Sequence, residues 1–124
     1  MVLKKQEGFP KHKRLLKRRQ FLEVQKNGHK VSSRYFIGLV LQHSNLDLGR
    51  LGITTTARYA NAVVRNRTKR LVRETFRRNL LSVPNGFDLV VIPKKHAQLQ
   101  RGASLIEDLV TLGAKLNSFI GEKP

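Results

Sequence analysis

The sequence predicts an α+β fold, a single-domain sandwich spanning residues 1–124, and three observations lead to this prediction. The chain has 124 residues, a length that suits one compact domain with one core. Its apolar residues, 40% of the total, gather in blocks such as 35–41 and 89–92, as they do in folded chains. Strand-like blocks alternate with helix-like ones, so we expect a mixed sheet covered by helices on one face.

The first part of the chain predicts a basic arm that leads into a helix. Lys and Arg dominate residues 4–19, and we expect residues 1–14 to form a flexible arm. From Leu15 onward, apolar residues recur at helical spacing, and Asn27-Gly28 supplies the stop signal of a helix C-terminus. A first helix should therefore end near Lys26.

Two strand patterns follow the first helix. Residues 33–41 are rich in β-branched and aromatic side chains, and residues 50–56 repeat this pattern after a polar stretch. We expect two antiparallel strands joined by a loop. Residues 30–32 allow one further short strand.

The second half of the chain predicts a helix, a strand and a final helix. Asn61 is placed to cap a long helix over residues 62–80, and a Pro-Asn-Gly turn at 84–86 follows it. The apolar run 87–92 predicts a buried strand, and helical spacing returns over residues 103–119. The expected order is α-β-β-(β)-α-β-α, where the bracket marks the optional short strand.

The charge of the chain indicates a polyanionic partner. It has 25 Lys and Arg residues against 8 Asp and Glu residues, a formal net charge of +17. This charge is larger than solubility requires of so small a domain. Nucleic acid is the first candidate, because cations that bind backbone phosphates release condensed counterions. An anionic membrane surface is the alternative.

The helix expected over residues 62–80 concentrates this charge. At about 100° per residue, an apolar side forms from Val64, Thr68, Leu71, Val72, Thr75 and Phe76. The opposite side collects Asn66, Lys69, Arg70, Arg73 and Arg77, with Arg67 and Arg78 beside them. A merely solvated face would mix acids with bases at i,i+4 spacing, whereas like charges recur here at 65/69, 69/73 and 73/77. The pattern therefore favours phosphate binding over solvation.

The sequence shows no arrangement of catalytic or metal-binding side chains. Its four histidines are scattered, and the adjacent Glu107 and Asp108 point to different sectors of a helix. Cysteine is absent, which excludes disulfides and thiol chemistry. No apolar run reaches the roughly 18 residues of a membrane span, and no signal-peptide pattern opens the chain. We expect a cytoplasmic protein that binds no membrane.

The basic helix resembles the signature of a known family. Arg65-Asn66-Arg67-x-Lys69-Arg70-x-x-Arg73-Glu74-x-Phe76-Arg77 is similar to the RNR motif of the bacterial ribonuclease P protein component. Phe21, Gly28, Gly52-Ile53, Asn61-Ala62-Val63 and the run 87–92 also match that family in order and spacing.

The resemblance implies a function and a set of binding residues. The chain would be the RNA-binding subunit of ribonuclease P, with the catalytic RNA and precursor tRNA as its partners and no obligate protein partner. That ribonucleoprotein is an endoribonuclease that removes the 5′ leader from precursor tRNA. Its RNA subunit would hold the Mg²⁺ ions and perform the hydrolysis, so the polypeptide alone would have no catalytic or metal-binding residues. RNA contacts would come from Arg65, Asn66, Arg67, Lys69, Arg70, Arg73 and Arg77.

The resemblance also implies a leader-binding cleft and an unusual crossover. The cleft would lie between the first helix and the sheet and involve Phe21, Gln25, Phe36, Leu39, Arg14 and Lys17. Many relatives carry an aromatic residue at position 25 and some carry one at position 39, so stacking on leader bases should be weaker here. The family has a left-handed β-α-β crossover around the basic helix, whereas about 98% of such connections are right-handed.

Two other functions fit the composition. A basic ribosomal protein or assembly factor would bind rRNA and add no cleavage activity. A membrane-surface protein would use the cationic helix on anionic lipid, although inserting that helix would cost the domain its core. The aromatic residues also have a simpler interpretation, since Phe21, Tyr35 and Phe36 on helices and strands are usually core residues.

Overall fold

The computed structural model describes residues 14–15, 17–43, 49–78 and 80–121. Most of the predicted basic arm, residues 1–13, lies outside this part. The elements are α2 (Arg18–Asn27), β1 (His29–Ser32), β2 (Phe36–Gln42), β3 (Arg50–Ile53), α3 (Ala62–Arg77), β4 (Phe87–Pro93), η2 (Lys95–Leu99) and α4 (Gly102–Gly121). The predicted α+β order is confirmed, and the short optional strand is β1. The 3-10 helix η2 was not predicted.

The sheet has the strand order β1-β2-β4-β3. Strand β2 pairs antiparallel with both β1 and β4, and β3 pairs parallel with β4. The two predicted strands over residues 33–41 and 50–56 do run in opposite directions, but they do not pair with each other, because β4 lies between them. Four consecutive residues of β4, 88–91, are buried, and such a strand is most stable in the middle of a sheet. The left-handed crossover around α3 stays a prediction.

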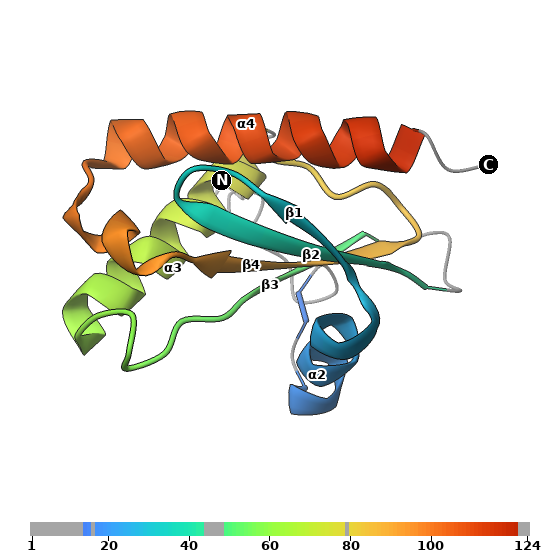
Figure 1. The fold of residues 1–124 in the computed structure, drawn as a ribbon, viewed down its shortest axis with the longest axis horizontal. Helices are drawn as coiled ribbons and strands as arrows, with labels where there is room; N and C mark the ends of the chain where they lie inside the picture. The colour runs from blue at the N-terminus through green and yellow to red at the C-terminus, as the bar shows by residue number, and fades with distance from the viewer. Residues whose placement is uncertain (1–13, 16, 44–48, 79, 122–124) are drawn as a thin grey trace, which may run out of the picture.

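Helices cover both faces of the sheet, so the prediction that only one face is covered is wrong (Figure 1). Val90 of β4 packs with Val24 of α2, and Leu39 and Ile92 join this smaller cluster. The larger core lies on the other face, where Leu89 and Val91 pack with α3 and α4. Neighbouring residues of one strand serve different clusters because side chains alternate across a sheet.

The basic helix α3 is anchored by the side that packs into the core. Val72 has no exposed surface, and Thr68 and Thr75 are buried beside it. Both threonine hydroxyls donate to carbonyl oxygens one turn earlier, Thr68 to Val64 at 3.0 Å and Thr75 to Leu71 at 2.8 Å. These bonds let polar side chains lie in the core without a desolvation penalty. The predicted apolar side of the helix is confirmed.

The ends of α3 follow from local hydrogen bonds. The Asn61 side chain accepts from the Val64 backbone N–H at 3.0 Å, which confirms the predicted N-cap. The helix ends at Arg77, before the predicted residue 80, because the backbone N–H of Leu80 turns back to the carbonyl of Thr75 at 3.0 Å. A single stable cap thus fixes where the cations of the helix begin.

Strand β2 begins three residues later than predicted because of a buried acid. The Asp108 carboxylate of α4 accepts from the Ser33 hydroxyl at 2.6 Å and from the backbone N–H groups of Arg34 and Tyr35 at 3.0 and 2.8 Å. These bonds hold residues 33–35 in a turn between β1 and β2. The carboxylate satisfies backbone donors that a strand would otherwise pair.

Gly52 of β3 sets the distance between α2 and the sheet, and this gives a prediction. A Cβ atom at this position would lie 2.6 Å from Cε1 of Phe21 and 2.9 Å from Cδ1 of Leu15. We expect Gly52→Ala to push α2 outward and to lower the free energy of unfolding by about 1–3 kcal/mol. Urea denaturation measures this loss. Gly102→Ala is the control, since its Cβ would meet its nearest neighbour at 3.6 Å, and an equal loss in both variants would contradict the explanation.

Candidate nucleic-acid interface

One side of α3 forms a groove of 430 Å³ that we name the cationic groove. Its lining residues are Arg14, Asn66, Lys69, Arg70, Arg73, Glu74 and Arg77. The structure therefore brings together the five residues that the helical spacing placed on one side. Because the backbone beneath them is fixed by the core, these cations are held on a rigid support, which lowers the entropy lost on binding.

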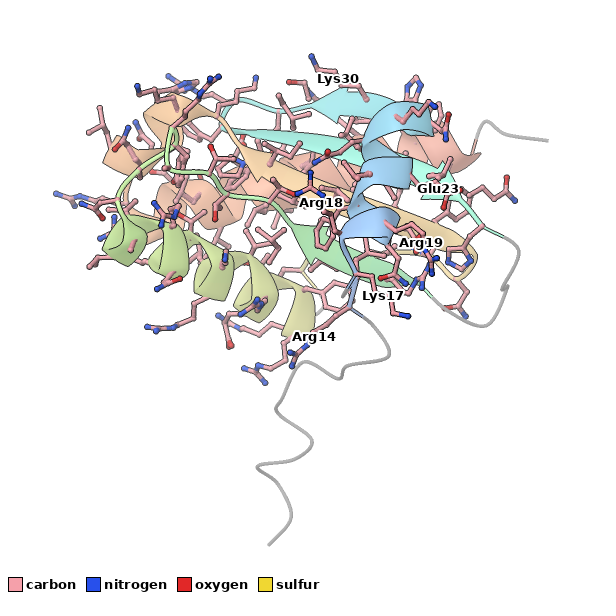
Figure 2. All side chains as sticks on the ribbon, turned by 90° about the horizontal axis from the view of Figure 1, so that it is seen from below. Arg14, Lys17, Arg18, Arg19, Glu23 and Lys30 are labelled. Carbon is pink, nitrogen blue, oxygen red and sulfur yellow. The ribbon has the colours of Figure 1, made fainter. Side chains whose placement is uncertain are left out.

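Arg14 enters the cationic groove from a segment that was expected to be flexible. The backbone N–H of Leu15 donates to the carbonyl of Leu51 at 3.0 Å, and Arg14 forms a parallel bridge with Leu51. The Leu15 side chain is buried against the α2 face of the sheet. Figure 2 shows the result, with Arg14 extending beside α3 before the chain enters α2. One strand-like contact thus positions a cation that helical periodicity alone does not place.

The single acid of the cationic groove is engaged by one arginine. Nε of Arg77 donates to Oε1 of Glu74 at 3.0 Å, and a second hydrogen bond joins Nη2 of Arg77 to Oε2 of Glu74. The hydrogen bond from Arg77, with the charges of Arg77 and Arg78, lowers the pKa of Glu74. Glu74 is therefore an internal partner of a neighbouring arginine.

Two other cations of the groove, Arg73 and Arg14, repel each other. Partial burial of the Arg73 guanidinium, together with the nearby charge of Arg14, lowers the pKa of Arg73. A lowered pKa means that the charged form is disfavoured in its surroundings. An anion placed between Arg73 and Arg14 would relieve this repulsion, so the geometry is suited to phosphate.

Arg65 and Arg67 do not line the cationic groove. Nη1 of Arg65 donates to the backbone carbonyl of Ala60 at 2.8 Å, which turns the side chain back toward the start of α3. Arg67 lines a separate groove on another side of the helix, together with η2 and the first residues of α4. The resemblance grouped all seven residues as one set, and the helix divides them.

A second groove, the α2 groove, has a volume of 480 Å³ and lies between α2 and the end of β3. Phe21 and Gln25 line it, as the leader-cleft assignment required. Lys69 lines both this groove and the cationic groove, so the two grooves are adjacent. Sequence reasoning missed the other lining residues, which are Arg18, Leu22, Ile53, Thr54 and Thr55. Helical spacing could have identified Arg18, because it precedes Phe21 by three positions and so lies on the same side of α2.

The other residues assigned to the leader cleft lie elsewhere. Phe36 has no exposed surface and belongs to the core on the α4 face, so its assignment is wrong. Leu39 points to the α2 face and packs in the cluster with Phe21, but it does not line the groove. Arg14 lines the cationic groove, and Lys17 is exposed at the N-cap of α2 and lines neither. Alternation along β2 explains why Phe36 and Leu39 face opposite sides.

The described residues contain neither a membrane-spanning helix nor a cluster of metal-binding side chains. No helix in this part of the chain is long and apolar enough to cross a membrane. No three His, Asp or Glu side chains among the described residues gather where a metal ion would be held.

Comparison with known proteins gives the family. The fold and the cationic groove define a small basic α+β protein with a surface suited to anionic ligands. The model of the Ribonuclease P family matches residues 9–117. The chain belongs to this family, and family membership implies that it is a component of ribonuclease P.

Individual relatives agree with this assignment. The ribonuclease P protein component of Thermotoga maritima is 44% identical over 89 residues, 72% of this chain and 75% of the relative. That of Desulforapulum autotrophicum is 39% identical over 109 residues, 88% of this chain and 92% of the relative. The structure of the Staphylococcus aureus RNase P protein matches with a TM-score of 0.75 at 29% identity, over 82% of this chain and 93% of that one. The Thermotoga maritima structure matches with a TM-score of 0.71 at 38% identity, over 81% and 94%.

The Glu74 and Arg77 pair gives a prediction about pH. Because the pKa of Glu74 is lowered in the folded protein, its ionised form contributes stability above the unfolded pKa, and this contribution is lost as pH falls through the folded pKa. We expect Arg77→Gln to raise the pKa of Glu74 toward its usual range, as measured by an NMR titration of the carboxyl carbon. Arg70→Gln is the control and should leave that pKa nearly unchanged. An equal rise in both variants would show a general charge effect instead of a specific pair.

Proposed function

We propose that this chain is the RNA-binding subunit of ribonuclease P, which assists a catalytic RNA in removing the 5′ leader from precursor tRNA. The observation that carries the proposal is the cationic groove, where Arg14 and the cations of α3 converge and the charged form of Arg73 is disfavoured. Family membership supports the choice of RNA as the anionic partner.

The cationic groove would act through phosphate binding and charge screening. Each guanidinium offers a planar fork of donors that matches two phosphate oxygens, and binding releases counterions from the RNA. Glu74 restrains Arg77 through two hydrogen bonds, so at least one fork is oriented before RNA arrives. In the complex, this row of cations would lower the repulsion between the catalytic RNA and precursor tRNA.

The α2 groove is our proposed site for the single-stranded 5′ leader. Phe21 offers an aromatic ring on which a base can stack, while Arg18 and Lys69 lie on either side for the backbone phosphates. Gln25 occupies the place one turn after Phe21 and supplies an amide in place of a second ring. The groove would therefore hold the leader largely through its backbone.

The division of labour in this proposal leaves bond cleavage to the RNA. The RNA subunit would hold the Mg²⁺ ions and activate the attacking water, as in metal-assisted hydrolysis generally. The polypeptide would supply binding energy and orientation to the reacting groups.

Reconstitution with a bacterial ribonuclease P RNA tests the proposal. We expect the purified chain to increase precursor-tRNA cleavage at low Mg²⁺ concentration, where the RNA alone is limited by phosphate repulsion. Cleavage is followed by gel analysis of the released leader. A protein that binds this RNA or rRNA and gives no gain in cleavage would contradict the proposal and favour a ribosomal or assembly role.

Measurements of RNA affinity at several salt concentrations test the cationic groove directly. We expect Arg70→Ala combined with Arg73→Ala to weaken binding to the RNA and to reduce the slope of log affinity against log salt by about 2, since each lost phosphate contact removes about 1. Lys30→Ala combined with Lys95→Ala removes the same charge from residues that line neither groove. An equal loss in both double variants would exclude a specific contact by the groove.

Gln25 provides a test of the α2 groove. We expect Gln25→Phe to add a stacking surface and to tighten the binding of leader-bearing precursor tRNA to the holoenzyme by roughly fivefold or more, since stacking contributes about 1–3 kcal/mol per base. Mature tRNA, which has no leader, should bind as before. Glu23→Phe is the control, because Glu23 is exposed on α2 and does not line the groove. An equal gain for mature tRNA would place the new contact outside the leader.

A further inference from the structure

A third groove, the η2 groove, lies on the side of α3 that faces η2 and the start of α4. In Figure 1 the short η2 turn, drawn in orange, lies next to α3 and leads into α4. The groove has a volume of 450 Å³ and shares no lining residue with the cationic groove or the α2 groove. Its size lies within the range of about 300–1,000 Å³ that is typical of small-ligand sites.

The floor of the η2 groove is apolar and its polar groups are already satisfied. The aliphatic side chains of Leu71, Ala97 and Leu105 line it. The hydroxyl groups of Tyr59 and Thr68 lie 2.8 Å apart and bond to each other. A planar ring placed on this floor would displace water without breaking a hydrogen bond of the protein.

Leu99 stands at the rim of this floor with 82% of its surface exposed. The turn that carries it is ordered, since the backbone N–H of Ala97 donates to the carbonyl of Lys94 at 2.9 Å and that of Gln100 to Ala97 at 3.0 Å. A single exposed leucine is common on protein surfaces. Leu99 is different because an ordered turn presents it to solvent beside an apolar groove, where it can contact a partner.

Two arginines flank the floor, and their guanidinium groups have no partner within the described part of the chain. Neither Arg67 nor Arg101 makes an ion pair or hydrogen bond there, in contrast to Arg50, which binds Asp88 with two bonds of 2.8 Å. The side-chain amides of Gln98 and Gln100 also line the groove and lack protein partners among those residues. No acid lines the groove.

We propose that the η2 groove binds one unpaired nucleotide of the ribonuclease P RNA. The base lies on the apolar floor against Leu99, its flanking phosphates lie at Arg67 and Arg101, and the two glutamine amides face its polar edge. This inference rests on the proposed function, because it takes RNA as the partner. A base-paired nucleotide does not fit, since its edge is used by its partner and its faces are stacked.

Charge selects RNA over a polypeptide, and position selects the catalytic RNA over the leader. Two unpartnered cations and no acid at the rim would repel a second copy of this chain, whose net charge is +17. A leader strand in the α2 groove would run along α2 and the end of β3, whereas the η2 groove is lined by α3, η2 and α4. A catalytic RNA bound in the cationic groove would lie on α3 and could reach the η2 groove on another side of the same helix.

Cross-linking locates the nucleotide. Benzoylphenylalanine introduced at Leu99 should cross-link, in the reconstituted holoenzyme, to one or a few unpaired nucleotides of a bacterial ribonuclease P RNA. The control position is Val63, which is 75% exposed on α3 and does not line the groove. The absence of a cross-link at position 99, a cross-link to precursor tRNA in its place, or a pattern identical to that from position 63 would overturn the proposal.

Affinity measurements test the chemistry of the groove. Leu99→Ser and Arg101→Gln are each expected to weaken binding of that RNA by roughly fivefold, the effect of about 1 kcal/mol from a lost apolar or phosphate contact. Arg101→Gln should also reduce the salt slope by about 1. Val63→Ser and Lys95→Gln are the matched controls and should stay within about twofold of the unsubstituted chain, a change below about 0.4 kcal/mol.

The outcomes separate this inference from the proposed function. If the unsubstituted chain stimulates cleavage while the Leu99 and Arg101 variants bind RNA like their controls, the groove proposal fails and the proposed function stands. If the chain gives no stimulation at all, the proposed function fails, and this proposal with it. A change in the sedimentation of the free protein caused by Leu99→Ser, with RNA affinity intact, would identify the groove as a protein contact and overturn the proposal.

Discussion

The packing of α3 against the sheet and α4 is the constraint on which the surface of this protein depends. Val72, Thr68 and Thr75 are buried there, and the two threonines satisfy their hydroxyls within the helix. Because this underside is fixed, the rotation of the helix about its axis is fixed as well. The cations therefore leave the helix at set angles and are distributed between two grooves. The geometry of this surface is thus specified largely by the buried residues beneath it.

Electrostatics gives these grooves different characters. The cationic groove holds like charges close together, and its one acid, Glu74, is hydrogen-bonded to Arg77. Partial burial of Arg73, together with the nearby charge of Arg14, lowers the pKa of Arg73. The η2 groove has fewer charges around a larger apolar floor. The α2 groove contains an aromatic ring, that of Phe21, and it shares Lys69 with the cationic groove. One helix therefore presents distinct chemistries on its different sides, which suits a partner that has both phosphates and bases.

Sequence reasoning succeeded where the determinants are local and failed where they are not. The cap at Asn61 and the faces of α3 follow from helical spacing, which relates residues only a few positions apart. The strand order depends on pairing between distant segments, and the sequence pattern does not show that β4 lies between the strands at 33–41 and 50–56. Alternation showed that Phe36 and Ile37 face opposite sides, but it does not say which side is the core. Arg14 was misjudged because one backbone contact with Leu51 orders it.

The contact between Arg14-Leu15 and Leu51 has a consequence for the solution behaviour of the protein. Strand β3 lies at one end of the sheet order, and an uncovered end strand is a template for pairing with other chains. The segment at residues 14–15 occupies part of that end through the bond from Leu15 to Leu51. If this segment detached, the cationic groove would lose Arg14, and backbone groups at the edge of β3 would become free to pair with another chain. RNA that holds Arg14 in place would thereby also keep this edge covered and protect the bound protein against aggregation.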